Sequence, residues 1–202
     1  MKLGRAGTIG RFKPLHNGGA VMLETVCSMA EHVIIAVGSV NKYNARNPFT
    51  AEESKAMIDA SLGKRFSNYS VMFIPDFGHL PEYRDGQKWR NHALEQFGEL
   101  DYLVTGNDYV ADLFRSDYKI IHPGVLIQRE KQIMLRATEV RVEMAKAGNW
   151  EKLVPEEVAE YIKKNGLDKR FRQEFGLETL AMADLYWLPE TREQEMHHAQ
   201  EA

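Results

Sequence analysis

The chain has 202 residues, with 26 Lys and Arg against 29 Asp and Glu, a formal net charge of −3 and one cysteine. This length is typical of one domain of roughly 150 residues with an appendage, and it can bury a core without disulfides or structural metal. Cys27 alone excludes an internal disulfide and a four-cysteine zinc site. The near-neutral balance argues against a broadly basic nucleic-acid surface, and no apolar run approaches the roughly 18 residues of a membrane span. Because the first residues also lack the apolar stretch of a signal peptide, we predict a cytoplasmic protein without nucleic-acid or membrane partners.

Charge is distributed unevenly along the chain. Residues 168–202 carry eight acidic and four basic side chains, a net of −4, which leaves +1 for residues 1–167. This change in composition begins just after Gly166. We therefore predict one domain over residues 1–166 and an acidic helical extension over residues 167–202.

Strand and helix patterns alternate along most of the chain. Apolar runs predict five strands, at residues 6–12, 33–40, 71–75, 101–107 and 119–122. Helical spacing and capping signals predict helices near 23–30, 50–62, 89–97, 138–147 and 155–165, of which the second begins with a Thr50–Glu53 capping box. This alternation predicts an α/β fold, a Rossmann-like doubly wound parallel sheet of about five strands with a helical C-terminal extension.

Loops that follow the strands of such a sheet meet at one edge, where ligands bind. The loop after the first strand has the composition of an anion site, with the residues Gly10, Arg11, Lys13, His16, Gly18 and Gly19. A helix start favours an anion through its free N–H groups and its dipole, and the glycines let a ligand approach the backbone. Neither a Walker pattern nor the dinucleotide-binding glycine pattern is present. By itself, this loop is equally compatible with an ordinary glycine-rich turn.

A second basic cluster lies near the end of the predicted domain. It consists of Arg129, Lys131, Arg136 and Arg141, with Thr138 in position to cap the helix that it starts. Arg141 would bring its guanidinium near that helix start and so create a second site shaped for phosphate. A basic helix start alone is commonly a solvated surface. Two such starts at one sheet edge favour a polyphosphate ligand.

The two segments resemble the motifs of a known superfamily. Gly-Arg-Phe-Lys-Pro-Leu-His-Asn-Gly at 10–18 resembles the Gly-Arg-Phe-x-Pro-x-His-x-Gly-His signature of the nucleotidyltransferases, and Leu-Arg-Ala-Thr-Glu-Val-Arg at 135–141 resembles their Ile-Ser-x-Thr-x-x-Arg motif. Gly38-Ser39, Asn47-Pro-Phe-Thr50 and the segment 150–155 look more narrowly like the archaeal nicotinamide mononucleotide (NMN) adenylyltransferases. The resemblance covers roughly residues 5–166, so residues 1–166 are expected to form a nucleotidyltransferase domain.

The resemblance implies a reaction and a set of roles. AMP would pass from ATP to NMN, giving NAD and pyrophosphate. His16, Arg11 and Arg141 would be catalytic, and the ATP phosphates would be bound by Gly10, Lys13, Gly18, Gly19, Arg136 and Thr138. Mg²⁺ would be held mainly by the ATP phosphates and not by a metal site of the protein.

The resemblance also implies an acceptor site. The expected NMN contacts are Arg46, Asn47, Phe49, Thr50 and Trp89, of which Trp89 would stack on the nicotinamide ring. The alternatives are simple core packing for Trp89 and a hydrophobic staple for Phe49. Asn107 and Asp108, at the end of the fourth strand, are candidate ribose or adenine contacts.

Three positions depart from the family pattern. Gly19 replaces the second histidine of the first motif, Arg136 replaces the serine of the second, and Ser54 stands where an arginine is usual. A lost donor to transition-state charge can cost on the order of 10²–10³ in rate. Two alternatives to the NMN adenylyltransferase follow: a catalytically impaired nucleotide-binding relative, or a nucleotidyltransferase with a different phosphate-bearing acceptor.

The extension has a helical pattern of its own. Its apolar spacing is carried by Leu177, Leu180, Ala181, Asp184, Leu185 and Leu188. This predicts one helix that buries an apolar stripe against the same chain or across a subunit boundary. Because proteins of the resembled family are commonly oligomeric, we predict a homo-oligomer supported by this segment.

Overall fold

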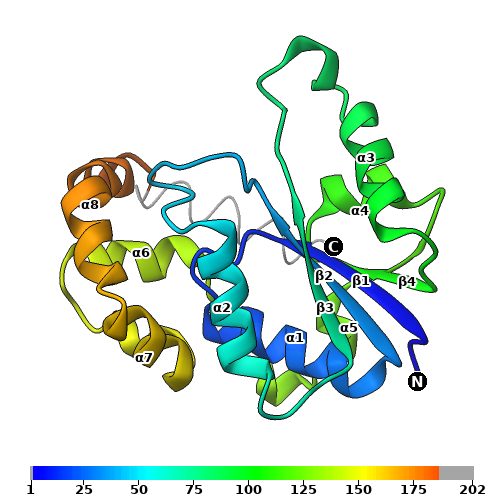
Figure 1. The fold of residues 1–202 in the computed structure, drawn as a ribbon, viewed down its shortest axis with the longest axis horizontal. Helices are drawn as coiled ribbons and strands as arrows, with labels where there is room; N and C mark the ends of the chain where they lie inside the picture. Colours follow the sequence, from blue (N-terminus) through cyan, green and yellow to red (C-terminus); the bar gives the residue numbers. More distant parts are fainter. Residues whose placement is uncertain (1, 187–202) are drawn as a thin grey trace.

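The structure is a computed structural model that describes residues 2–186, with side chains as far as residue 183. The strands are β1 (Arg5–Gly10), β2 (His32–Gly38), β3 (Tyr69–Ile74), β4 (Tyr102–Val104) and β5 (Lys119–Ile121). The α-helices are α1 (Asn17–Met29), α2 (Ala51–Leu62), α3 (Gln87–Phe97), α4 (Asp108–Phe114), α5 (Pro123–Leu126), α6 (Ala137–Ala145), α7 (Glu156–Lys164) and α8 (Leu167–Tyr186) (Figure 1). Short 3-10 turns are η1 (Pro81–Tyr83), η2 (Arg129–Lys131) and η3 (Trp150–Leu153).

The five strands form one parallel sheet in the order β3-β2-β1-β4-β5. Strand β2 lies inside the sheet, where Val33 pairs with Ala6 on one side and with Tyr69 on the other. Its side chains alternate between two cores, so that Ile35 packs in one core and Ile34 in the other. The run is apolar throughout because both faces are covered, as expected for a parallel sheet. The predicted Rossmann-like α/β fold is confirmed.

Helices cover both faces of the sheet. Helices α3 and α4 cover one face, where Ala93, Phe97 and Phe114 pack on the sheet residues. The other face lies against α1 and α2, and its core continues into α6, α7 and the start of α8. Figure 1 shows α6, α7 and α8 grouped beside α2, away from α3 and α4. The core therefore extends from the sheet into a helical group at its side.

The ends of several elements differ from the sequence prediction. Strand β1 ends at Gly10 and not at residue 12, because Phe12 has a φ of 50° and leaves the extended conformation. Strand β4 ends at Val104, and α4 was not predicted at all. Helix α4 is short, and its start is stabilised by the Asn107 side chain, which accepts a hydrogen bond from Val110 N–H at 3.1 Å. A seven-residue helix offers too few turns for its apolar period to be recognised.

Within one chain, helix α8 buries a face other than the predicted apolar stripe, which leaves the subunit boundary as the place where that stripe could be buried. Leu177 is 86% exposed, whereas Leu167 and Phe171 are buried in the main core. Thr179 and Gly176 lie on the buried side as well. The aromatic residues in the first half of the helix decide its orientation, because they have the larger apolar surface to bury. Leu188 and the side chains of Asp184 and Leu185 lie outside the described residues.

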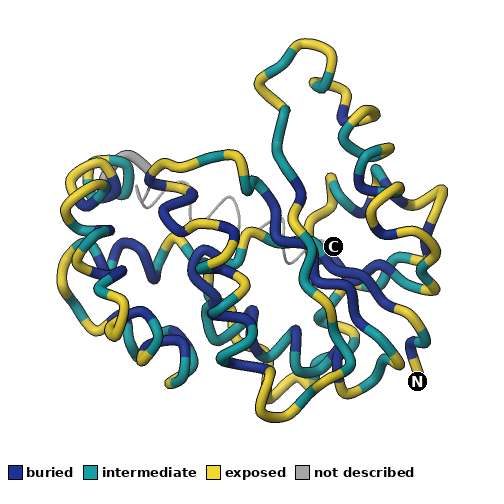
Figure 2. Tube along the Cα trace, in the orientation of Figure 1, coloured by how far each residue is buried: buried dark blue, intermediate teal, exposed yellow. Residues whose placement is uncertain are grey.

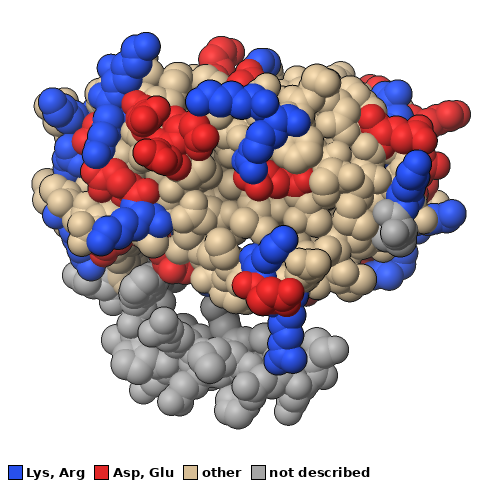
Figure 3. All heavy atoms as spheres, turned by 90° about the horizontal axis from the view of Figure 1, so that it is seen from below, with Lys and Arg blue, Asp and Glu red and all other residues tan. Residues whose placement is uncertain are grey.

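Burial follows the sheet and the inner faces of the helices, and the segment between β3 and α3 is one of the most exposed (Figure 2). On the face seen in Figure 3, basic and acidic side chains are interspersed. Within residues 2–186, no helix is both long and apolar enough to cross a membrane.

Candidate active site

The loop between β1 and α1 places His16 at the N-cap of α1. His16 Nδ1 accepts a hydrogen bond from Gly19 N–H at 3.1 Å. Burial, followed by the charge of Arg141, lowers the pKa of His16 to about 4. The imidazole is therefore neutral near pH 7, and because Nδ1 is an acceptor, the proton lies on Nε2. His16 thus offers one N–H donor that carries no positive charge.

Gly18 and Gly19 of this loop differ in how much space a side chain would have. A Cβ at Gly18 would lie 2.6 Å from the Ile133 carbonyl oxygen, so the backbone of the first loop and that of the 127–136 segment approach here too closely for a side chain. A Cβ at Gly19 would lie 3.2 Å from Leu15 Cδ1 and 3.8 Å from His16 Nε2. Only the flexible end of a leucine side chain limits that position. A side chain at residue 19 would begin beside the His16 imidazole.

Arg141 connects the second motif to the first. Its guanidinium donates to the Lys13 carbonyl oxygen at 2.9 Å and to Thr138 Oγ1 at 3.0 Å, and the residue is only 5% exposed. Helix α6 begins at Ala137 with Arg136 at its N-cap. The expectation that Thr138 caps this helix is therefore wrong, because Thr138 lies inside the first turn and its hydroxyl is used to orient Arg141. The Arg136 N–H donates to the Glu139 carboxylate at 3.3 Å.

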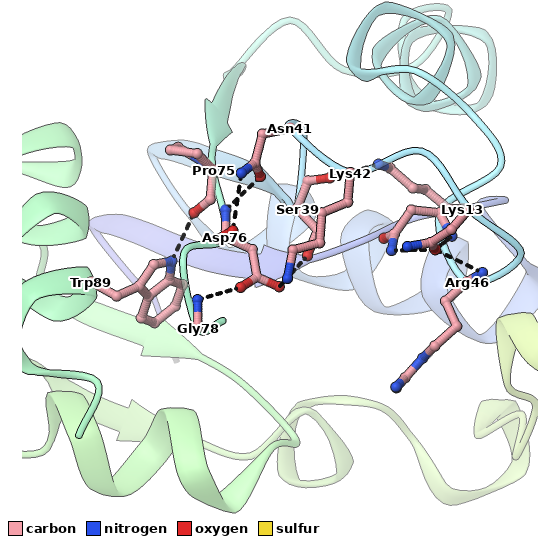
Figure 4. Close-up of polar contacts among 11 residues, drawn as sticks. Lys13, Ser39, Asn41, Lys42, Arg46, Pro75, Asp76, Gly78 and Trp89 are labelled. Atoms are coloured by element: carbon pink, nitrogen blue, oxygen red, sulfur yellow. Dashed lines mark hydrogen bonds and ion pairs between the residues drawn. The ribbon is translucent and has the colours of Figure 1, made fainter. Parts of the chain in front are cut away.

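Lys13 is fully buried below this loop. Its ammonium donates to the Ser39 carbonyl oxygen at 3.1 Å, which joins the loop after β1 to the end of β2 (Figure 4). Burial is the main reason that the pKa of Lys13 is lowered to about 8, and the charge of Arg11 contributes while Glu53 opposes it. Lys13 therefore adds a charge beneath the loop and has no exposed surface for a ligand.

The cations at this edge of the sheet repel one another. Burial, followed by the charges of Arg11 and Arg46, lowers the pKa of Arg141 to about 10. Partial desolvation and the charge of Arg46 also lower the pKa of Arg11, against an opposing effect of Asp76. Among the described residues, no carboxylate lies within ion-pair distance of Arg141. A set of like charges held together in this way is stabilised by a bound polyanion.

The segment after β2, residues 43–53, carries four of the expected NMN contacts and is called the acceptor segment. Residues 44–47 form a tight turn in it, the acceptor turn. Asn44 Oδ1 accepts hydrogen bonds, each of 3.1 Å, from Arg46 N–H, Asn47 N–H and the Asn47 side-chain amide. Asn47 is 4% exposed, and its Oδ1 has no hydrogen-bond partner within the described chain. Buried acceptors are nearly always paired. The turn ends with this buried amide and includes Arg46, whose side chain extends away from the turn in Figure 4.

Two predicted acceptor residues have structural roles. Phe49 is completely buried and stacks on Phe171 at 6.4 Å between ring centroids, so it has no surface for a ligand. Thr50 forms the predicted capping box with Glu53: Thr50 Oγ1 accepts from Glu53 N–H at 3.1 Å, and Thr50 N–H donates to the Glu53 carboxylate at 2.9 Å. Both residues shape the segment that carries Arg46 and Asn47.

Trp89 lies near the end of β3. Its indole N–H donates to the Pro75 carbonyl oxygen at 3.1 Å (Figure 4), and its ring meets Phe114 edge-on at 5.8 Å. The residue is only half-buried. These two contacts fix the orientation of the ring while part of it stays accessible for stacking.

Asp76 joins the loops after β2 and β3. Its carboxylate accepts from Ser39 Oγ at 3.2 Å, pairs with Lys42 at 3.0 Å and accepts from Gly78 N–H at 2.9 Å. Burial alone would raise the pKa of Asp76, but these hydrogen bonds and the Lys42 charge lower it. Asn41 adds hydrogen bonds to the Asp76 backbone on both sides, with lengths of 2.7 and 3.0 Å. The network joins the loop after β2 to the loop after β3, although more than thirty residues separate the two loops in the sequence.

The structure brings together Arg11, Lys13, His16, Arg46 and Arg141, which the sequence places in three segments. Asn107 is used as the cap of α4, and Asp108 is exposed in the first turn of that helix. Sequence reasoning missed Asn44, whose side chain organises the turn before Asn47. An asparagine two to three residues before hydrogen-bonded backbone N–H groups is a recognisable turn signal. It also missed Arg170, which contacts the acceptor segment from α8 and for which no local signal exists.

The sequence matches the cytidylyltransferase-like family over residues 8–146, which include the end of β1, the first loop and α6 with Arg141. The chain belongs to the cytidylyltransferase-like family. It is also 35% identical to a nicotinamide-nucleotide adenylyltransferase of Thermococcus onnurineus over 157 residues, which cover 77% of this chain and 80% of that protein. It is 33% identical to the nicotinamide-nucleotide adenylyltransferase of Archaeoglobus fulgidus over 174 residues, which cover 83% of this chain and 95% of the relative.

The fold of this cytidylyltransferase-like chain is similar to that of a solved structure. A bifunctional NMN adenylyltransferase/ADP-ribose pyrophosphatase from Francisella tularensis, complexed with AMP and a manganese ion, superposes with a TM-score of 0.66 at 21% identity. The match covers 91% of this chain and 53% of that one. At this identity, the likeness concerns the fold alone.

Proposed function

We propose that this protein is a nicotinamide-nucleotide adenylyltransferase, which joins the AMP part of ATP to NMN and releases pyrophosphate. The observation that carries the proposal is the cluster of His16, Arg11, Arg46 and Arg141, in which the three arginines repel one another and Arg141 lies near the neutral imidazole donor. The curated relatives from Thermococcus and Archaeoglobus support the substrate assignment.

The reaction needs alignment of two anions and stabilisation of charge on phosphate oxygens. A 5′-phosphate oxygen of NMN attacks the α-phosphorus of ATP, the bond from that phosphorus to the bridging oxygen breaks, and pyrophosphate leaves. His16 Nε2–H donates to an α-phosphate oxygen. Arg11 and Arg141, together with the N–H groups at the start of α1, bind the polyphosphate. No covalent enzyme intermediate is required.

The acceptor is bound by the segment after β2. Asn47 Oδ1 accepts a hydrogen bond from a donor group of NMN, Arg46 binds its phosphate, and the ring of Trp89 stacks on nicotinamide. The assignment of Asn47 is supported by its orphaned buried oxygen, and that of Trp89 by its partly accessible, fixed ring.

Mg²⁺ accompanies the reaction as the counterion of ATP. Within the described residues, no group of three or more His, Cys, Asp or Glu is arranged to hold a metal ion. Mg²⁺ is commonly bound through substrate phosphates and keeps several waters. When bound, the ion neutralises charge on the phosphates that leave as pyrophosphate.

A pyrophosphate-release assay tests the proposal. The full chain is incubated with ATP and Mg²⁺ and with NMN, nicotinate mononucleotide, a flavin mononucleotide or a phosphopantetheine as acceptor. We expect turnover with NMN and formation of NAD. Turnover with another acceptor alone would establish the alternative substrate, and nucleotide binding by calorimetry without any turnover would establish the impaired relative to which Gly19 points.

Self-association and a cytoplasmic location remain predictions from the sequence. We propose that the extension from residue 167 contributes to a homo-oligomer. Sedimentation of the full chain and of a chain ended after Tyr186 measures the part of this contribution that comes from residues 187–202, because that truncation keeps α8. A chain without residues 168–202 tests the whole extension, and an unchanged mass of that chain would contradict the proposal.

A further inference from the structure

One face of α8 contacts the segment that carries the proposed acceptor residues. The Arg170 guanidinium makes two hydrogen bonds to the Glu53 carboxylate, of 2.6 and 2.7 Å, and a third to the Pro48 carbonyl oxygen at 3.0 Å. Glu53 and Arg170 are separated by 117 residues. The side chains of the pair are 16% and 30% exposed, so water screens the contact only in part.

The same face of α8 also holds Tyr43, at the other end of this segment. The Tyr43 hydroxyl donates to the Glu174 carboxylate, and its ring meets Phe175 edge-on at 5.1 Å. The Arg170 guanidinium lies 5.9 Å from the centre of the Tyr43 ring. Residues 170, 174 and 175 recur at helical spacing, so one stripe of α8 makes all these contacts.

The contacts of this stripe enclose the acceptor turn. Arg46 and Asn47 lie between Tyr43 and Pro48, and both of these flanking residues are held by α8. Glu53 connects the stripe to the rest of the site. Its carboxylate also accepts a hydrogen bond from Thr50 N–H at 2.9 Å, and its negative charge raises the pKa of Lys13, against the effect of burial. Burial would raise the pKa of Glu53, but the Arg170 and Thr50 hydrogen bonds and the charges of Arg170 and Lys13 lower it.

We propose that Arg170 is a positioning residue for the acceptor nucleotide, and that the first half of α8 is thereby a part of the acceptor site. Arg170 fixes the backbone at Pro48 and the carboxylate of Glu53, and so sets the place of Arg46 and Asn47 relative to the cations of the first loop. This inference rests on the proposed function and deepens it. In this proposal Arg170 acts through these two contacts and does not bind ATP or NMN itself.

The chain offers a matched control on the same helix. Arg172 pairs with Asp168 at 2.7 Å and also approaches the Met144 carbonyl oxygen at 3.4 Å. Its side chain is 27% exposed, close to the 30% of Arg170. It faces α6 and not the acceptor segment. Arg170→Met and Arg172→Met therefore each remove a partly buried arginine pair from α8, but only the first releases the acceptor turn.

Steady-state kinetics of the full chain separate positioning from stability. For Arg170→Met, we expect kcat/KM for NMN to fall roughly 10- to 100-fold, the range typical of misplaced substrates, with KM for ATP changed less than about twofold. Arg172→Met should leave both values near those of the wild type at a temperature where both variants are folded. Arg170→Lys should recover only part of the loss, because lysine keeps the charge and loses the two-pronged contact. Equal effects of the two methionine variants on NMN would overturn the proposal.

Hydrogen exchange gives a readout that does not need turnover. We expect faster exchange of the Asn47 amide and its neighbours in Arg170→Met and wild-type exchange there in Arg172→Met. If the wild type has no activity with NMN, the proposed function fails, whereas unchanged exchange in Arg170→Met overturns the positioning role itself. Tyr43→Phe keeps the test possible if Arg170→Met does not fold, because it loses only the hydroxyl contact to Glu174. We expect a smaller increase in the exchange rate of the Asn47 amide in this variant. An unchanged exchange rate would count against the proposal.

Discussion

Arg141 and Arg170 each donate to a backbone carbonyl oxygen of a loop at the same edge of the sheet, but their charges are in opposite situations. Arg141 binds Lys13 O and Thr138, and burial with the charges of Arg11 and Arg46 lowers its pKa to about 10. Arg170 binds Pro48 O and both oxygens of Glu53, and the hydrogen bonds to Glu53 raise its pKa. Within residues 2–186, the charge of Arg170 has a carboxylate partner and that of Arg141 has none.

The difference is that the charge of Arg170 stabilises the folded chain, whereas Arg141 is the arginine that we propose to bind a ligand. A carboxylate next to Arg141 would stabilise the free protein and compete with phosphate for the guanidinium. The repulsion in the uncompensated cluster therefore lowers the free energy of unfolding of the free protein, and a bound anion raises it again. The acceptor segment shows the reverse, since its ion pair with α8 is complete before any ligand binds.

The largest effect should come from His16, at the centre of the uncompensated cluster. For His16→Ala, we expect kcat to fall on the order of 10²–10³, as for loss of an oxyanion donor. The lost N-cap should lower the free energy of unfolding by about 1 kcal/mol. Pyrophosphate release and urea unfolding measure the two effects.

His16→Asn is the control for this substitution. Asparagine is a good N-cap and should restore the stability, while kcat stays well below that of the wild type. Recovery of full activity by asparagine would show that His16 acts only as a cap.

Arg141→Met and Arg170→Met sharpen the comparison of the two arginines. We expect Arg141→Met to lower kcat/KM for ATP by about 100-fold, because a charge-assisted contact to polyphosphate is lost. Its unfolding free energy should change by less than about 1 kcal/mol, since relief of the like charges offsets the two lost hydrogen bonds. Arg170→Met should lose about 1–2 kcal/mol, as for a partly buried ion pair with one partner removed.

Urea unfolding of both variants in phosphate-free buffer measures this contrast. A larger stability loss for Arg141→Met than for Arg170→Met would show that the first arginine is the structural one. Addition of ATP should stabilise the wild type more than Arg141→Met.

The pH dependence of stability tests the neutral state of His16. Its pKa is about 4 in the folded protein and near 6.5 in an unfolded chain, so the unfolded state binds more protons between these values. The contribution of His16 is therefore fully present above about pH 6.5 and is lost as the pH falls toward 4. Urea unfolding at several pH values should show a steeper decline for the wild type than for His16→Asn, and identical slopes would contradict the low pKa.

The smallest effect is expected at Gly19. Its backbone N–H stays available to His16 in any variant, and its Cβ would meet only the end of the Leu15 side chain. Gly19→His should therefore fold and raise kcat by up to about 10-fold, since a second donor lies beside the first. Gly19→Ala is the control for helix propensity, which should add stability of about 0.5–1 kcal/mol without a change in rate. A rate gain in the alanine variant would contradict the role of the added imidazole.

Local sequence was sufficient for many features of the fold. The apolar run of β2 predicts a strand covered on both faces, and the Thr50–Glu53 spacing predicts the capping box that the structure contains. These features depend on residues a few positions apart. Helix α4 was missed because seven residues carry too little periodicity, and the face that α8 buries within one chain was not predicted because Leu177 fits the pattern as well as Phe171 does.

The sequence by itself determined the alternating parallel sheet, the loop with His16 at a helix start and the basic residues near the second helix start. Each of these follows from turn chemistry, capping or the period of apolar residues within a short segment. Only the tertiary structure decided that Arg141 binds the Lys13 carbonyl, that Phe49 belongs to the core and that Arg170 pairs with Glu53. The physical reason is that these contacts join residues 117 to 128 positions apart, and their energies depend on burial and on neighbouring charges that appear only when the chain is folded.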